Sequence, residues 1–136
     1  MKIESIIPIL RIFDYRKAIE FYVDWLGFEI VWKHYFEENS PVYMEVEKDG
    51  LTLHLSEHHG DATPGAKVFV WCAGLKDYHK ILIGKQYKNN KPGFEETFYG
   101  SWCVEVIDPF GNKISFNEKK DSYKRTGEYS FKSTSE

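Results

Sequence analysis

The pattern of apolar and polar positions divides the chain into short elements. An apolar run, IIPILRIF, begins at Ile6 and fits a buried strand. Asp14 follows as a suitable N-cap for DYRKAIEFYVDWLGF, where apolar residues recur at helical spacing up to Gly27. Three runs rich in β-branched and aromatic residues come next, EIVWKHYF, PVYMEVEKDG and LTLHLSE, and an Asp-Gly turn joins the last two. The first half is therefore predicted to be β-α-β-β-β.

The second half of the chain repeats this order. KVFVWC fits a strand, GLKDYHKILIGKQYK fits an amphipathic helix, and SWCVEVIDPFGNKISFNE fits a hairpin. The hairpins of the two halves share a hydrophobic pattern and a Glu-Val pair, which begins at Glu45 in one and at Glu105 in the other. The offset between the halves is 61 residues from His54 to Ser115. Such a period indicates duplicated structure.

We therefore predict an α+β fold with one domain over about residues 1–120. It consists of two tandem βαβββ modules, the first over about residues 1–60 and the second over about residues 61–120. Residues 121–136 are polar and low in aliphatic side chains, which predicts a mobile C-terminal tail.

Composition narrows the classes of function. The aromatic share of 17% is high for 136 residues, so many rings must pack together or line a cavity. A net charge of −3 argues against a nucleic-acid partner and leaves room for a cationic ligand. No apolar run approaches the roughly 20 residues that span a bilayer, and the first residues lack the features of a signal peptide, so we expect a cytoplasmic protein with no membrane partner. In that setting Cys72 and Cys103 are expected to be buried thiols and not a disulfide.

Four segments in order, PILRIFDYRKAIEFYVDWLGF, VWCAGL, YGSW and DPFGNKISF, resemble the vicinal-oxygen-chelate superfamily over about residues 3–119. This superfamily holds glyoxalase I, extradiol dioxygenases, fosfomycin-resistance enzymes and bleomycin-resistance proteins, and the chain is most similar to the bleomycin-resistance-like branch. The resemblance implies that eight strands form a curled mixed sheet around a cavity. It also implies a homodimer with ligand sites between modules, with or without exchange of strands between subunits.

Metal-dependent members of the superfamily take their ligands from the first and fourth strands of each module. Carried onto this chain, those positions are Ile7 and His54 in the first module, and Lys67 and Ser115 in the second. Only His54 is a plausible ligand, whereas a transition-metal ion needs three or four N, O or S donors. We therefore expect no metal and no other cofactor.

Strand alternation selects the side chains that face the predicted cavity. In LTLHLSE the leucines share one face, so His54 lies on the other. His58 and His59 come after the strand, and they are either solvated loop residues or, with Asp61, part of the cavity rim. The aromatic residues expected around the cavity are Trp32, Tyr35, Tyr43, Trp71, Tyr99 and Trp102. The candidate ligand-binding residues are His54, Glu45, Glu105, Trp102, Tyr99, Trp71, Tyr43 and Ser115.

Three functions remain open. Carboxylates beside flat rings suit a planar cation, so the first is a non-catalytic protein that sequesters a cationic or aromatic, antibiotic-like compound of the bleomycin type. The second is a metal-dependent or acid–base enzyme of the glyoxalase or dioxygenase kind, which would use His54 with Glu45 or Glu105. The third is a structural dimer whose own side chains fill the cavity. If Glu45 and Glu105 are buried, a cationic ligand, Lys67 or bound water could each stabilise their charge. In the simplest case the two carboxylates lie on a solvated strand face or form ion pairs in a dimer interface.

Overall fold

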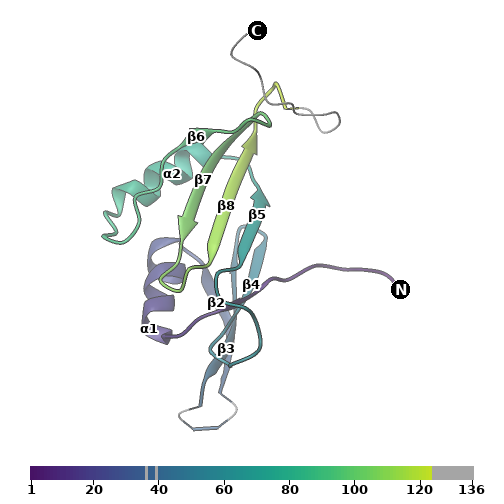
Figure 1. Ribbon diagram of the computed structural model, residues 1–136, viewed down its shortest axis with the longest axis vertical. Helices are drawn as coiled ribbons and strands as arrows, with labels where there is room; N and C mark the ends of the chain where they lie inside the picture. The colour runs from purple at the N-terminus through teal and green to yellow at the C-terminus, as the bar shows by residue number, and fades with distance from the viewer. Residues whose placement is uncertain (36, 39, 124–136) are drawn as a thin grey trace.

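The structure, a computed structural model, describes residues 1–35, 37–38 and 40–123 (Figure 1). Most of the predicted C-terminal tail, residues 124–136, therefore lies outside the described residues. The first module forms a four-stranded sheet in the order β1-β4-β3-β2, in which β1 and β4 are parallel and the other pairs are antiparallel. Its elements are β1 (Ile9–Arg11), α1 (Tyr15–Ala18), the π-helix η1 (Ile19–Trp25), β2 (Glu29–Tyr35), β3 (Val42–Lys48) and β4 (Leu51–Ser56).

The second module has the same topology. Its sheet has the order β5-β8-β7-β6, and again only the pair formed by its first and last strands is parallel. Its elements are β5 (Lys67–Trp71), α2 (Leu75–Gly84), β6 (Glu95–Glu96), β7 (Ser101–Ile107) and β8 (Lys113–Lys119). The α+β fold with two βαβββ modules is confirmed, and the eight strands are divided between two open sheets.

The first strand starts later than the apolar pattern predicts. β1 begins at Ile9 and not at Ile6, because Pro8 has no N–H to donate to the ladder with β4. The Pro8 carbonyl still accepts a hydrogen bond of 2.9 Å from the His54 N–H. The residues before it run out from the body of the molecule, and the side chain of Ile6 is 86% exposed (Figure 1).

The first helix is capped as predicted but has an unexpected pitch. The Asp14 side chain accepts from the Lys17 N–H at 3.0 Å, and Gly27 ends the helix at a φ of +90°. Between them the backbone widens into the π-helix η1, with the Leu26 N–H bonded to the Phe21 carbonyl at 2.9 Å. The wider turns allow the adjacent rings of Phe21 and Tyr22 both to be fully buried.

The helix end of the first module is bonded to the second module. The Tyr78 hydroxyl of α2 donates to the Leu26 carbonyl at 2.6 Å, and the Trp25 Nε1–H donates to the Leu82 carbonyl at 3.1 Å. Lys85 Nζ donates to the Trp25 carbonyl at 2.7 Å. Both helices lie on the same side of the two sheets (Figure 1), and the buried apolar residues of both modules form one core on that side. We call the opposite side of the sheets the open face.

Candidate functional site

The open face of the first module carries a hydrogen-bonded chain of three side chains. His54 on β4 lies directly opposite Glu45 on β3, and its Nε2 is 2.9 Å from Glu45 Oε1. Its Nδ1 is 2.7 Å from the Tyr43 hydroxyl. A carboxylate only accepts, so in a neutral imidazole Nε2 carries the proton and Nδ1 accepts from Tyr43. The alternation of Met44 and Val46, both fully buried, with Tyr43 and Glu45 was predicted correctly.

An exposed indole completes this group. The Trp32 ring is stacked on the Tyr43 ring at a centroid distance of 5.8 Å and an interplanar angle of 11°, and it meets the His54 ring edge-on at 5.4 Å. Trp32 is 41% exposed, so part of this side chain is accessible to a ligand beside the Glu45 carboxylate. We call Trp32, Tyr43, Glu45 and His54 the first-module cluster.

Trp32 reaches the open face only because β2 contains an irregularity. Ile30 is paired with Val46, but Trp32 is paired with Glu45, so one extra residue lies between the two pairs. Without that shift Trp32 would oppose Met44 and point into the core. Strand alternation alone cannot predict such an extra residue. Trp32 was expected among the aromatic residues around the cavity, but it was not one of the candidate ligand-binding residues.

Burial affects the phenol of this cluster. Partial burial, with the nearby Asp61 carboxylate as a second cause, raises the pKa of Tyr43 above its ordinary value. The phenol is therefore neutral at physiological pH and acts as a hydrogen-bond donor to His54.

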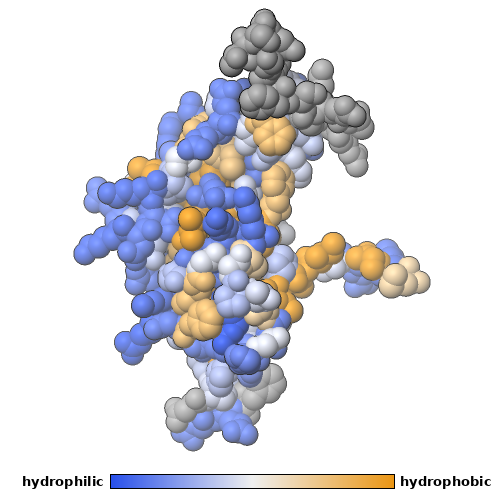
Figure 2. Space-filling view, in the orientation of Figure 1, coloured by the Kyte–Doolittle hydropathy of each residue, from blue (hydrophilic) through white to orange (hydrophobic). Residues whose placement is uncertain are grey.

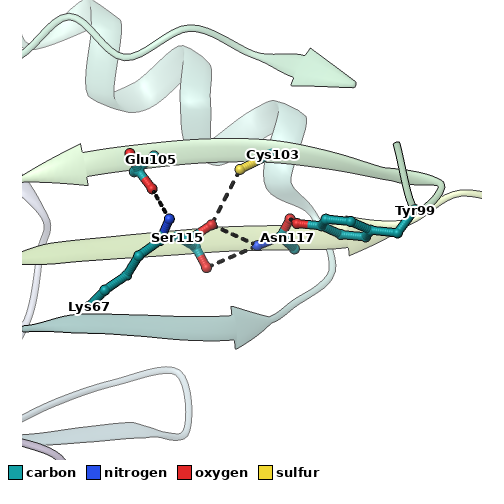
Figure 3. A network of polar contacts seen from close by, with 6 residues as sticks. All are labelled: Lys67, Tyr99, Cys103, Glu105, Ser115 and Asn117. Atoms are coloured by element: carbon teal, nitrogen blue, oxygen red, sulfur yellow. Dashed lines mark hydrogen bonds and ion pairs between the residues drawn. The ribbon is translucent and has the colours of Figure 1, made fainter. Parts of the chain in front are cut away.

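The open face of the second module carries a different polar network (Figure 3). Glu105 is repeat-related to Glu45, but its Oε1 forms an ion pair of 2.8 Å with Lys67 Nζ. The hydrogen bond that Lys67 donates to Glu105 is the larger cause, and the negative charge of Glu105 the next, of a pKa of Lys67 that is raised above its ordinary value. The lysine that the sequence offered as one partner for Glu105 is thus the partner in the structure.

The rest of the network runs along β8. Asn117 Nδ2 donates to Ser115 Oγ at 2.9 Å, the Tyr99 hydroxyl donates to Asn117 Oδ1 at 2.9 Å, and Cys103 Sγ is 3.4 Å from Ser115 Oγ (Figure 3). These contacts leave Ser115 nearly fully buried. Asn117, which the sequence analysis did not select, connects the candidate residues Tyr99 and Ser115.

Aromatic rings also gather on this second face. The Trp71 ring lies 4.9 Å from Phe69 and 6.4 Å from Tyr99, both with edge-to-face geometry. Phe69 is 47% exposed and lies opposite Ser115 on β8. Figure 2 shows apolar side chains along the edge of the molecule over β5, continuing onto the N-terminal segment.

Trp102 is separate from the other candidate residues. It shares the side of β7 with Val104 and Val106, and its ring is stacked on Phe94 at 5.0 Å. Phe94 in turn contacts His79 of α2. Trp102 therefore lies on the helix side of the sheet and not on the open face with the other candidates. Alternation from Val104 places it on the same side.

The loop after β4 has a pocket of its own. His59 and Asp61 line a space of about 560 Å³ together with Arg11 and Phe13, and Asp61 Oδ2 accepts a hydrogen bond of 2.6 Å from Ser56 Oγ. None of Trp32, Tyr43, Glu45 and His54 lines this pocket, and His59 and Asp61 are both exposed to solvent, as expected for solvated loop residues.

The residues present do not fit a metal ion. The register places Ile9, and not Ile7, opposite His54, and it places Phe69, and not Lys67, opposite Ser115, so the first-strand positions had been assigned two residues too early. Neither Ile9 nor Phe69 offers a donor atom. Across the described ranges, no group of three or more His, Cys, Asp or Glu side chains is arranged to hold a metal.

Two further expectations concern cysteines and membranes. Cys72 and Cys103 are free thiols, as predicted, but both are half-buried and not fully buried.

In the part of the chain that the structure describes, no helix is long and apolar enough to cross a bilayer.

Solved structures with the same fold include antibiotic-binding proteins. TnmS3, an antibiotic-binding protein from Streptomyces sp. CB03234, is 20% identical, with 88% of this chain and 99% of that chain covered and a TM-score of 0.69. A bleomycin-binding protein complexed with bleomycin is 18% identical, with 87% and 100% covered and a TM-score of 0.64. A glyoxalase family protein from Bacillus anthracis is 17% identical, with 88% and 98% covered and a TM-score of 0.64.

At the level of sequence, no curated protein matches this chain. The family model described as "Glyoxalase superfamily protein" matches residues 1–123, which include both modules. These residues carry the repeated βαβββ topology and the DPFGN turn of the second hairpin. The chain therefore belongs to the glyoxalase superfamily.

Proposed function

We propose that this protein is a non-catalytic binding protein that sequesters a planar, cationic small molecule of the bleomycin type in the cytoplasm. The observation that carries the proposal is the first-module cluster, in which the Glu45 carboxylate lies beside the exposed face of Trp32. A flat cation gains stacking and cation–π contact from the ring and charge pairing from the carboxylate. The antibiotic-binding proteins that share the fold support this class of ligand.

The two repeat-related carboxylates contribute unequally to this proposal. Glu105 is already neutralised by Lys67 at 2.8 Å, whereas Glu45 is bonded to the imidazole of His54 at 2.9 Å. The imidazole of His54 orients the carboxylate and, unlike the ammonium of Lys67, carries no permanent charge. The cationic part of the ligand is therefore assigned to the first module, and the rings of Phe69, Trp71 and Tyr99 are assigned to its apolar part.

Binding between modules of two subunits would bring these two groups together. Both faces are open in the single chain, and exposed apolar residues continue from β5 onto the N-terminal segment (Figure 2). We propose a homodimer in which the first-module cluster of one subunit faces the rings of the second module of its partner. The ligand site then consists of residues from both subunits.

Isothermal titration calorimetry with bleomycin tests the assignment. Glu45→Gln removes the charge and keeps the shape, so we expect the Kd to rise by about tenfold or more, as for loss of a charged hydrogen bond. Glu105→Gln is the matched control, for which we expect less than about a threefold change. Equal losses would contradict the assignment of the cation to Glu45, and absence of binding to the wild type would exclude bleomycin itself as a ligand.

A second candidate function is acid–base catalysis. The chain from Tyr43 through His54 to Glu45 holds the imidazole in one orientation, and His54 Nδ1 can take the proton of the Tyr43 hydroxyl, which would make Tyr43 the group that exchanges a proton with a substrate. A turnover assay with candidate substrates, comparing wild type with His54→Ala, separates the two functions. Loss of turnover in His54→Ala with retained substrate binding would favour the enzyme over the sequestering protein.

A further inference from the structure

A second cavity lies where the two modules meet, on the helix side of the sheets. It has a volume of about 530 Å³, within the range of roughly 300–1,000 Å³ that small-molecule sites occupy. The first module contributes Phe28 and the β3–β4 turn, residues 48–51. The second module contributes residues 70–75, Phe116 and one side of α2. Since both modules form the walls, the cavity exists only in the assembled domain.

The walls are predominantly aromatic and aliphatic. Phe28, Tyr78 and Phe116 line the space, and the Tyr78 and Phe116 rings meet edge-to-face at 5.5 Å. The Tyr78 hydroxyl is bonded to the Leu26 carbonyl, so the phenol presents its apolar ring to the cavity. Ile81 also lines the space, and it is 55% exposed, which leaves apolar surface that an occupant would cover.

The charges around the cavity favour an uncharged occupant. Among the described residues that line it, Lys48 is the one cation, and its Nζ is 3.4 Å from the carboxylate of Asp49 and 5.3 Å from the centre of the Tyr78 ring. Asp77 is exposed to solvent at the rim. Burial raises the pKa of the Cys72 thiol, which keeps it neutral. A charged ligand would lose its hydration here without gaining an available counter-ion inside the walls.

We propose that this cavity is a second binding site, which takes an uncharged aromatic molecule of small-molecule size. Rings on several sides of the space suit stacked and edge-on contact with a flat, apolar ligand. A concave space of this volume encloses a small molecule, whereas a second copy of the chain is better accommodated by the exposed apolar residues of the open face. The site does not depend on the proposed sequestering function, because Trp71 is the single open-face candidate among its described lining residues, and the Trp71 ring lies against Phe69 and Tyr99 on the open face.

Nile red, an uncharged polycyclic dye that fluoresces in apolar surroundings, is a suitable probe for fluorescence titration of the full-length protein. Ile81→Asp places a charge on the cavity wall and should raise the dye Kd by about tenfold. Ile83→Asp is the matched control, because Ile83 is an exposed isoleucine of the same helix that does not line the cavity. We expect it to change the Kd by less than about twofold.

A third variant separates cavity binding from general adhesion to apolar surface. Ala73 lines the cavity and is exposed, so Ala73→Phe adds apolar surface while filling the space. We expect weaker dye binding, whereas adhesion to surface would become stronger. Circular dichroism spectra that match the wild type show that each variant is folded. Among folded variants, an equal rise of the dye Kd in Ile81→Asp and Ile83→Asp, or a lower dye Kd in Ala73→Phe, would overturn the proposal.

The open face provides the remaining control. Trp32→Ala and Glu45→Gln should leave the dye Kd within about twofold of the wild type, because neither residue lines this cavity. A loss of dye binding in Trp32→Ala as large as that in Ile81→Asp would place the dye on the open face and overturn the proposal. Bleomycin binding fails or succeeds independently of these results, so the two proposals are tested separately.

Discussion

The carboxylate of Asp108 accepts hydrogen bonds from residues of both modules. Tyr22 of the first module donates its hydroxyl to Asp108 Oδ2 at 2.6 Å, and Asn112 Nδ2 donates to the same oxygen at 2.8 Å. Asn112 Nδ2 also donates to the Arg11 carbonyl at 2.8 Å. The Asp108 Oδ1 atom accepts from the backbone N–H of Phe110 and of Asn112. The DPFGN segment is therefore more than a hairpin turn, because it holds β1 and the first helix against the second module.

Removing the Tyr22 hydroxyl should destabilise the protein measurably. Tyr22 is fully buried, and Tyr22→Phe leaves Asp108 Oδ2 without one of its donors, so we expect the free energy of unfolding to fall by about 1–3 kcal/mol. Urea denaturation followed by fluorescence measures this. Tyr15→Phe is the control, because Tyr15 makes an exposed hydrogen bond with Lys33, and its effect should stay within about 0.5 kcal/mol. Equal effects of the two variants would contradict the role assigned to Asp108.

Residues on regular strands could be predicted from the sequence, and residues beside irregularities could not. Alternation along β3 and β4 correctly placed Glu45 and His54 together on one face. Trp32 was correctly expected near this face, but alternation along β2 could not have placed it there, because the extra residue reverses the face on which Trp32 lies. The pairing of Glu105 with Lys67 was one of several alternatives, since the sequence does not give the register of a parallel pair.

At the scale of elements, α2 begins at a glycine in a left-handed conformation. Gly74, with a φ of +75°, precedes the first helical residue, and the Leu75 N–H is bonded to Glu118 Oε1 at 2.8 Å. An L side chain at this φ is strained, so Gly74→Ala should lower the free energy of unfolding by about 1 kcal/mol.

Gly84 in the same helix is the matched comparison. Its φ is not positive, and a Cβ there would meet nothing within 4 Å. Gly84→Ala should raise the free energy of unfolding by about 0.5 kcal/mol, because alanine favours the helix and restricts the unfolded chain. Thermal and urea denaturation of the two variants should therefore shift in opposite directions, and shifts in the same direction would contradict this account of the α2 start.

The π-helix is the element that the hydrophobic pattern described least well. Apolar residues at helical spacing predicted an ordinary α-helix as far as Gly27, whereas η1 (Ile19–Trp25) has wider turns. Contacts with the other module end this helix, because the backbone carbonyls of Trp25 and Leu26, which a helix end leaves free, accept side-chain hydrogen bonds from Lys85 and Tyr78. Such partners lie more than 50 residues away in the sequence, so a local pattern contains no information about them.

At the scale of the whole molecule, the exposed apolar residues bear on oligomeric state. We expect light scattering coupled to size-exclusion chromatography to give twice the chain mass of 16.0 kDa. Phe69→Lys on the open face should shift the protein toward the monomer, because a charge there disfavours burial in an interface. Ile83→Lys on α2 is the matched control and should leave the mass unchanged. A monomeric wild type at micromolar concentration would exclude a site built from two subunits.

The bond between Tyr22 and Asp108 also affects how the chain can fold as it is synthesised. Tyr22 leaves the ribosome early, but its partner is 86 residues further along the chain. Until Asp108 emerges, the first module can bury the Tyr22 ring only by leaving its hydroxyl without that acceptor, at a cost of about 1–3 kcal/mol. The two modules share one topology, but the first cannot make this bond until nearly the whole domain has been translated.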